Sequence, residues 1–168
     1  TNGALYVDNV SISMLAVNGN KANNTGGGGI YLNGRNCEVS GCFVYDCPDI
    51  AILVGVPGNG ATDTPLAGAT RIVNNYCKNS GYSGHVYTCI AVTHSSNIVI
   101  SGNIVESTDG FTSVGIDIEP NSGNTIDNIL VTGNTVKGAT IVADCANLAA
   151  PGTNISIVGN RVDANGVA

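Results

Sequence analysis

The chain has 168 residues, of which 43% are hydrophobic, 11% are charged and 23 are glycine. This length suits one compact domain with a hydrophobic core. A net charge of −6 with only six Lys and Arg residues argues against a nucleic-acid partner, because that binding depends on clustered cations. No run of about 18 apolar residues and no signal-peptide pattern occurs, so neither a membrane span nor an export signal is predicted.

Short β-strands are predicted along the chain, because Gly or Asn interrupts nearly every window long enough for a helix. One pattern recurs six times, with its clearest copies reading NIVISGNIV, NILVTGNTV and NISIVGNRV. In chain order the copies are Asn9–Val17, Asn36–Val44, Thr70–Cys77, Asn97–Val105, Asn128–Val136 and Asn154–Val162. Self-similarity at a spacing of about 20 to 50 residues is typical of stacked units that bury their apolar faces against their neighbours.

Two columns of the aligned copies are apolar throughout. They consist of Ile12, Val39, Ile72, Ile100, Val131 and Ile157, and of Val17, Val44, Cys77, Val105, Val136 and Val162. Between them lies a column of Leu15, Cys42, Asn75, Asn103, Asn134 and Asn160. Asn tolerates the left-handed backbone conformation of a sharp bend, and stacked Asn amides can hydrogen-bond to one another. This column therefore predicts a corner.

A second apolar segment follows five of the copies after a loop of variable length. These segments are Gly29–Leu32, Ala51–Val54, Cys89–Val92, Gly115–Ile118 and Ala139–Val142. Alternation places Ile30, Ile52, Ile90 and Ile116 inward. Three short strands per turn with one Asn corner predict an all-β, single-domain, right-handed parallel β-helix of about six coils. The handedness follows from the general preference for right-handed parallel crossovers.

With this repeat and its Gly-Asn corner, the chain resembles the pectate-lyase-like superfamily of parallel β-helices from Asn9 to Val162. Within that superfamily, Gly110–Val136 is most similar to the shafts of bacteriophage tailspikes and related polysaccharide-processing proteins. The resemblance implies a polysaccharide partner, a homotrimer, and a location outside the cell or on a virion surface. Because neither end carries a visible cap, we expect a piece of a longer chain, or neighbouring chains that cover the ends.

The sequence GIDIEP contains the candidate catalytic residues. With Ile116 and Ile118 inward, Asp117 and Glu119 project outward into a groove bordered by loops. Glycoside hydrolysis uses two carboxyl groups. Residues i and i+2 on one face of a strand are about 6.6 Å apart, which is twice the strand rise. This separation is near the lower edge of the distance of about 6.5–9.5 Å between the two carboxyl groups of inverting glycosidases. Asp117 and Glu119 are therefore a candidate acid–base pair; the alternative is a solvated strand face or a role in binding sugar hydroxyls.

Five further residues are candidates for contact with the sugar. Tyr31 and Asn33 occupy the equivalent outward positions of another coil, Thr93 and His94 follow the strand CIAV, and Tyr87 lies in the loop before it. Aromatic rings stack on sugar faces, and polar tips bind hydroxyl groups. The predicted loops before the groove strands are 18–28, 79–88 and 106–114.

A lyase or epimerase acting on uronic acids needs cations or bound calcium to neutralise the substrate carboxylate. Lys and Arg are absent from the aligned groove strands, and the calcium-binding Asp cluster and catalytic Arg of pectate lyases have no counterpart. Cys37, Cys42 and Cys47 are interpreted as core thiols rather than metal ligands, so no metal and no cofactor are predicted. The leading hypothesis is a polysaccharide-binding and polysaccharide-cleaving glycosidase. The alternatives are a structural or adhesive repeat domain and a lyase or epimerase.

Overall fold

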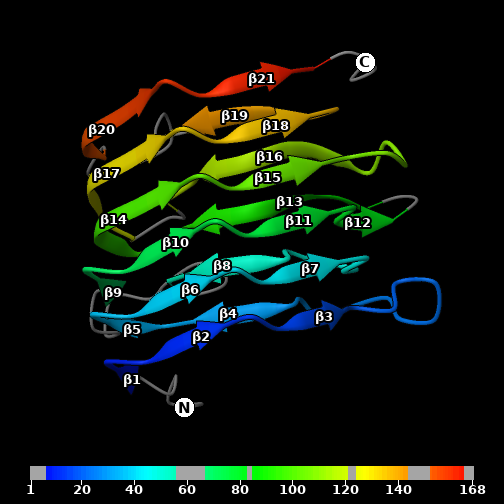
Figure 1. The fold of residues 1–168 in the computed structure, drawn as a ribbon, viewed down its shortest axis with the longest axis horizontal. Coiled ribbons are helices and arrows are strands. Elements are labelled where there is room, and N and C mark those ends of the chain that lie inside the picture. The colour runs from blue at the N-terminus through cyan, green and yellow to red at the C-terminus, as the bar shows by residue number, and fades with distance from the viewer. Residues whose placement is uncertain (1–6, 56–66, 83–84, 121–123, 144–151, 165–168) are drawn as a thin grey trace.

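The computed structural model describes residues 7–55, 67–82, 85–120, 124–143 and 152–164. Within these ranges the chain forms strands and no helix, and the strands stack as a parallel β-helix of about five turns with three strands per coil (Figure 1). Strands in front run in one direction and those behind return, so that the chain rises with a right-handed winding (Figure 1). The predicted fold class is confirmed.

Sheet A has nine strands. They are β1 (Val7–Asp8), β2 (Ser11–Ser13), β5 (Gly34–Arg35), β6 (Glu38–Ser40), β9 (Ala67–Gly68), β10 (Arg71–Val73), β14 (Ser95–Ser101), β17 (Ile126–Thr132) and β20 (Thr153–Val158). Sheet B has six strands, which are β3 (Ala16–Asn18), β7 (Phe43–Tyr45), β11 (Tyr76–Lys78), β15 (Ile104–Glu106), β18 (Thr135–Lys137) and β21 (Arg161–Asp163).

Sheet C forms the third side of each coil. Its strands are β4 (Ile30–Leu32), β8 (Ile52–Val54), β13 (His85–Val92), β16 (Thr112–Ile118) and β19 (Thr140–Ala143), with β12 (Gly81–Tyr82) added as an antiparallel partner of β13. The segment 79–88, predicted as a loop, therefore contains an antiparallel strand pair, in which Gly81 and Tyr82 lie opposite Val86 and His85. Likewise, β16 begins inside the predicted loop 106–114.

The register pairs equivalent residues of successive copies. Ile72 lies between Val39 and Ile100 in sheet A, and Cys77 lies between Val44 and Val105 in sheet B. In sheet C the predicted inward isoleucines are likewise paired in the order Ile30, Ile52, Ile90 and Ile116. All of these side chains belong to one buried core, which confirms the inward face of the second strands and the middle of the two apolar columns. The last members of the columns, Ile157 and Val162, are 41% and 46% exposed in the last described coil.

The corner between sheets A and B is two residues long in every coil. The first residue is left-handed, with φ between 55° and 66° at Met14, Gly41, Asn74, Gly102, Gly133 and Gly159. The prediction that the Asn column itself takes this conformation is wrong, because the positive φ falls one residue earlier. The second residue instead turns its side chain into the stack.

At this second position four asparagines form a ladder, called the inner ladder below. Its members are Asn75, Asn103, Asn134 and Asn160. The Asn103 amide nitrogen donates to Ile72 O at 2.8 Å and to Asn134 Oδ1 at 2.9 Å, and the Asn103 backbone N–H donates to the same oxygen at 2.9 Å. The predicted hydrogen bonding along the stack is confirmed, and the buried corner amides are satisfied.

A second row of left-handed residues lies on the outside of sheet A and is called the outer row. It contains Asn9, Asn36, Ala69, Asn97, Asn128 and Asn154. Its amides also pair across coils, with 2.6 Å between Asn36 Nδ2 and Asn9 Oδ1 and 2.7 Å between Asn128 Nδ2 and Asn97 Oδ1. Ala69 alone lacks an amide, although its φ is 50°.

The cysteines of the described ranges are free and buried, as predicted. They are Cys37, Cys42, Cys47, Cys77 and Cys89, while Cys145 lies outside those ranges. Burial raises the pKa of the Cys77 and Cys89 thiols, and it raises that of Cys47 to about 12. These thiols are therefore protonated packing groups at neutral pH.

Candidate functional site

The outward face of sheet C carries the predicted site. Its first outward row contains Tyr31, Leu53, Ala91, Asp117 and Val142 in direct register. Tyr31 is 42% exposed, whereas Leu53 and Ala91 are 0% and 3% exposed and Asp117 is 9% exposed. Most of this row is therefore sheltered from solvent, although it points away from the core.

Asp117 and Glu119 differ in their surroundings. Asp117 lies in β16 between the fully buried Ile116 and Ile118, and Thr88 Oγ1 lies 3.4 Å from its Oδ2 as a hydrogen-bond donor. Glu119 follows the strand, is exposed, and its backbone N–H donates to Val92 O at 3.0 Å. The pair thus combines one sheltered carboxyl group with one that contacts solvent.

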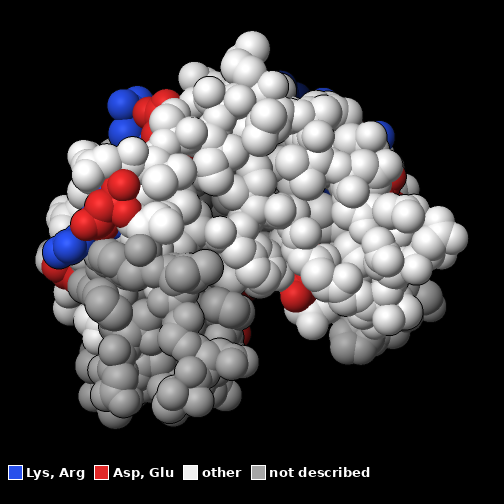
Figure 2. All heavy atoms as spheres, turned by 90° about the horizontal axis from the view of Figure 1, so that it is seen from below, with Lys and Arg blue, Asp and Glu red and all other residues white. Residues whose placement is uncertain are grey.

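Acidic side chains are visible on the side of sheet C. Sheet C lies behind the other two sheets in Figure 1, so it forms the lower side of the view from below in Figure 2. Among the described residues, Asp or Glu atoms are visible on that side, whereas the visible Lys and Arg atoms lie away from it (Figure 2).

Tyr31 and Tyr87 lie near a carboxylate that sequence reasoning missed. The Tyr31 hydroxyl donates to Asp49 Oδ2 at 2.8 Å; burial, followed by this hydrogen bond, raises the pKa of Tyr31. Burial also raises the pKa of Tyr87, with the Asp49 charge as the next cause. Asp49 therefore lies close enough to influence both predicted sugar-binding tyrosines. Its only sequence signal is its place in the loop before the strand AILV.

Asn33 and Thr93 belong to a second outward row, with Gly55 and Glu119. Thr93 is buried, and a Cβ atom placed on Gly55 would lie only 2.4 Å from Thr93 Oγ1, so the Gly55 backbone packs directly on this hydroxyl. The Asn33 side-chain amide atoms are buried and have no hydrogen-bond partner among the described residues. Thr93 is thus packed closely against Gly55, whereas the Asn33 amide makes no hydrogen bond within the described part of the chain.

His94 lies in the turn between β13 and β14 and is 8% exposed. Its Nδ1 accepts the backbone N–H of Thr125 at 3.0 Å. In the neutral ring the proton therefore resides on Nε2. This bond fixes the tautomer and orients the ring in the turn.

A separate pocket lies at the corner between sheets B and C. Its volume is about 350 Å³, and its lining residues are Asn18, Asn20, Lys21, Ala22, Asp46, Tyr82 and Phe111. Sequence reasoning did not identify this pocket, because most of its residues lie in loops that have no periodic pattern, while Asn18 and Tyr82 lie at strand ends. Tyr82 hydrogen-bonds through its hydroxyl to Thr25 O at 3.2 Å.

Within the described ranges, no group of three or more His, Cys, Asp or Glu side chains is arranged to hold a metal ion. None of the described segments forms a helix long and apolar enough to cross a membrane. Comparison of the chain with protein-family models, curated protein sequences and solved structures finds no match. The parallel β-helix is thus shown by the structure, and the resemblance to a narrower family stays a prediction.

Proposed function

We propose that this β-helix binds a polysaccharide along the outward face of sheet C and hydrolyses it with Asp117 and Glu119. One observation carries the proposal: consecutive outward positions of a single coil of sheet C hold two carboxyl groups, one sheltered and one exposed. Paired carboxyl groups in unlike surroundings are what acid–base catalysis of glycoside hydrolysis requires.

In an inverting reaction, one carboxylic acid gives its proton to the leaving glycosidic oxygen while the other carboxylate takes a proton from the attacking water. The products are two shorter chains, with one molecule of water consumed for each bond broken. The exposed ring of Tyr31, three coils away in sheet C, offers a stacking surface, and the carboxylate of Asp49, in the loop before β8, offers a hydroxyl acceptor. The proposed family is the pectate-lyase-like superfamily and, within it, the homotrimeric tailspike type, located outside the cell or on a virion.

The test follows reducing ends and ultraviolet absorbance together while the protein is incubated with bacterial surface and plant polysaccharides. A hydrolase releases reducing ends without an absorbing product, and Asp117→Asn and Glu119→Gln should each lower the rate at least about 100-fold. Asp8→Asn is the matched control, because its carboxylate is on sheet A in an exposed ion pair with Arg35. An absorbing product would identify a lyase, and unchanged rates in both variants would exclude the acid–base assignment.

The second candidate is a non-catalytic structural or adhesive domain. It is favoured by the burial of Asp117 and its contact with Thr88, since a carboxyl group in such a place also serves to fix neighbouring strands. In that case no reducing ends are released, whether or not the polysaccharide binds. Asp117→Asn then lowers the melting temperature, and there is no cleavage rate to change.

A further inference from the structure

The pocket between sheets B and C is built by segments from several coils. Asn18 ends β3, Asp46 directly follows β7, Tyr82 ends β12, and Phe111 directly precedes β16. These segments are separated by tens of residues in sequence and meet only because the coils stack. The pocket is lined by none of the residues assigned to the hydrolytic site.

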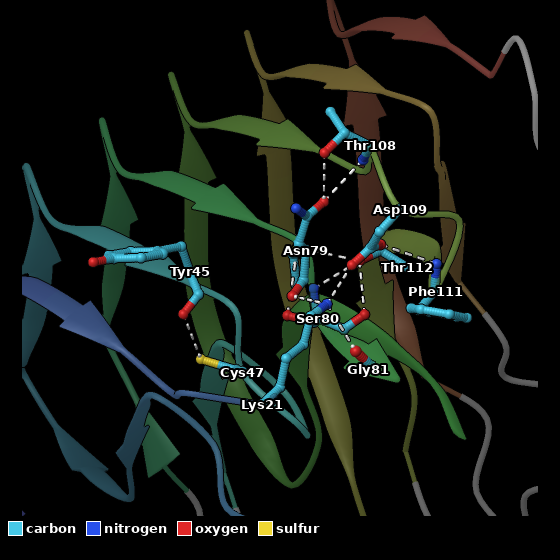
Figure 3. A network of polar contacts seen from close by, with 11 residues as sticks. Lys21, Tyr45, Cys47, Asn79, Ser80, Gly81, Thr108, Asp109, Phe111 and Thr112 are labelled. Carbon is cyan, nitrogen blue, oxygen red and sulfur yellow. Dashed lines mark hydrogen bonds and ion pairs between the residues drawn. The ribbon is translucent and has the colours of Figure 1, made fainter. Parts of the chain in front are cut away.

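Lys21 holds these segments together (Figure 3). Its Nζ donates to Asn79 O at 2.8 Å and to Gly81 O at 2.9 Å, and it forms a further hydrogen-bonded ion pair with Asp109. The Lys21 side chain is 14% exposed, so its three hydrogen-bond positions are used inside the protein. The ammonium group is therefore a structural tie, already neutralised by a carboxylate.

The same network fixes the Phe111 wall of the pocket, and a separate hydrogen bond holds the Tyr82 wall. Asp109 Oδ1 accepts the backbone N–H of Phe111 at 3.1 Å, and the Lys21 ammonium nitrogen lies 5.7 Å from the centre of the Phe111 ring. Tyr82 is anchored through its hydroxyl to Thr25 O. Because these groups are ordered before any ligand arrives, binding carries a smaller entropic cost.

Three polar side chains of the pocket keep hydrogen-bonding capacity for a ligand. The Asp46 carboxylate accepts no hydrogen bond from the described residues. The oxygen of Asn18 accepts the N–H of Asn20 at 2.8 Å, and the oxygen of Asn20 accepts from Asn23 at 2.8 Å. The amide nitrogens of Asn18 and Asn20 are therefore left as donors, beside the Asp46 acceptor.

We infer that this pocket binds one or two units of an uncharged sugar, at a second site independent of the hydrolytic pair. Aromatic walls stack on the apolar face of a sugar ring, while one carboxylate and two amide donors match its hydroxyl groups. The charged groups of the network are Lys21, Asp109 and Asp46, which leave one net negative charge and repel a uronic acid. The volume of about 350 Å³ is near the lower end of ligand pockets and suits a small ligand.

Titration of the ¹⁵N-labelled protein with single sugars tests this inference. The panel contains glucose, galactose, rhamnose and N-acetylglucosamine as neutral sugars, with galacturonic acid and glucosamine as charged ones. We expect at least one neutral sugar to shift the backbone amide signals of Lys21, Asp46 and Phe111, and galacturonic acid to shift none of them. Asp46→Ala and Phe111→Leu should each weaken the binding about tenfold, with Asp8→Asn as the control.

Melting temperatures of both variants are measured alongside, so that lost binding is separated from lost folding. Absence of shifts with every neutral sugar overturns the inference, as does preferential binding of galacturonic acid or glucosamine. Equal affinity in wild type and both variants also overturns it. Failure of the hydrolytic proposal is seen separately, since Asp117→Asn and Glu119→Gln alter polysaccharide cleavage and leave the amide shifts at the pocket unchanged.

Discussion

The chain turns a corner on either side of sheet B, and different kinds of groups close the two corners. The corner with sheet A is always two residues long and is closed by neutral amides of the inner ladder. The corner with sheet C is of variable length and gathers an ammonium group, carboxylates and thiols, including Lys21, Asp109 and Cys47. Repetition at the first corner fixes the stack, which frees the second corner to vary and to form a pocket.

This difference predicts that single changes at the regular corner cost the most stability. Asn103→Ala removes the acceptor of the Asn75 backbone N–H and the donor to Ile72 O, both of which stay buried. Because each buried group left unpaired costs about 1–3 kcal/mol, we expect a loss of about 4 kcal/mol in the free energy of unfolding. Urea unfolding measures it.

The matched control for Asn103→Ala is Asn97→Ala in the outer row. Asn97 accepts from Asn128 at an exposed position, so water replaces the lost bond and only the left-handed backbone preference is affected. We expect a loss of about 1 kcal/mol. Equal losses in the two variants would show that burial of the inner ladder contributes nothing.

Alkaline pH should act on the buried thiols, of which Cys47 lies at the variable corner, Cys77 in β11 and Cys89 in β13. The pKa values of Cys47, Cys77 and Cys89 are raised in the folded state, chiefly by burial. The free energy of unfolding is therefore at its full value below the thiol pKa of the unfolded state, about 8.5, and it falls as pH rises toward the thiol pKa values of the folded state. The fall is up to about 1.4 kcal/mol per pH unit for each thiol that folding keeps protonated. Urea midpoints at increasing pH under reducing conditions measure this slope.

Cys47→Ala should make that slope shallower, since the variant lacks one group whose ionisation is suppressed by folding. The Asn amides of the regular corner do not titrate and add nothing to the slope. A pH-independent urea midpoint in this alkaline range would contradict the prediction.

Lys21→Met should loosen the variable corner without disturbing the stack. Three oxygens lose their donor, and the Asp109 carboxylate keeps a charge with no cation bonded to it, so we expect a loss of about 2 kcal/mol. Limited proteolysis should show faster cleavage within residues 19–28. Lys78→Met is the control: its partly exposed ion pair with Glu106, at 3.8 Å, contributes less than about 1 kcal/mol.

The smallest expected effect is a gain in stability. Ala69→Asn places an amide at the left-handed position that lacks one, between the coils of Asn36 and Asn97. Asn adopts this conformation more readily than Ala and gains a potential partner on either side, so we expect about 0.5–1 kcal/mol. A rise in melting temperature checks it, and Ala69→Val should lower the melting temperature instead.

The regular part of the molecule was predictable because the register places equivalent residues on top of one another. Ile72 and Cys77 occupy predicted columns, and their neighbours above and below are the predicted ones. The left-handed residue was misplaced by one position, since Gly102 and Asn103 both tolerate that conformation and only burial decides which one adopts it.

The candidate sites were less predictable, because they depend on contacts that do not repeat. Alternation placed Asp117 outward, but its burial depends on what covers that face. Lys21 and Asp109 are 88 residues apart and belong to loops of different coils, so neither has a periodic signal. Asp49 was missed for the same reason.

The parallel pairing of successive coils also gives the molecule a direction of mechanical weakness. The backbone hydrogen bonds between coils run along the stack. A force that draws the two ends of the stack apart therefore separates the coils one at a time. A force applied across the stack is shared by many boundaries at once. The rod should therefore unravel from an end at low axial tension and resist lateral shear.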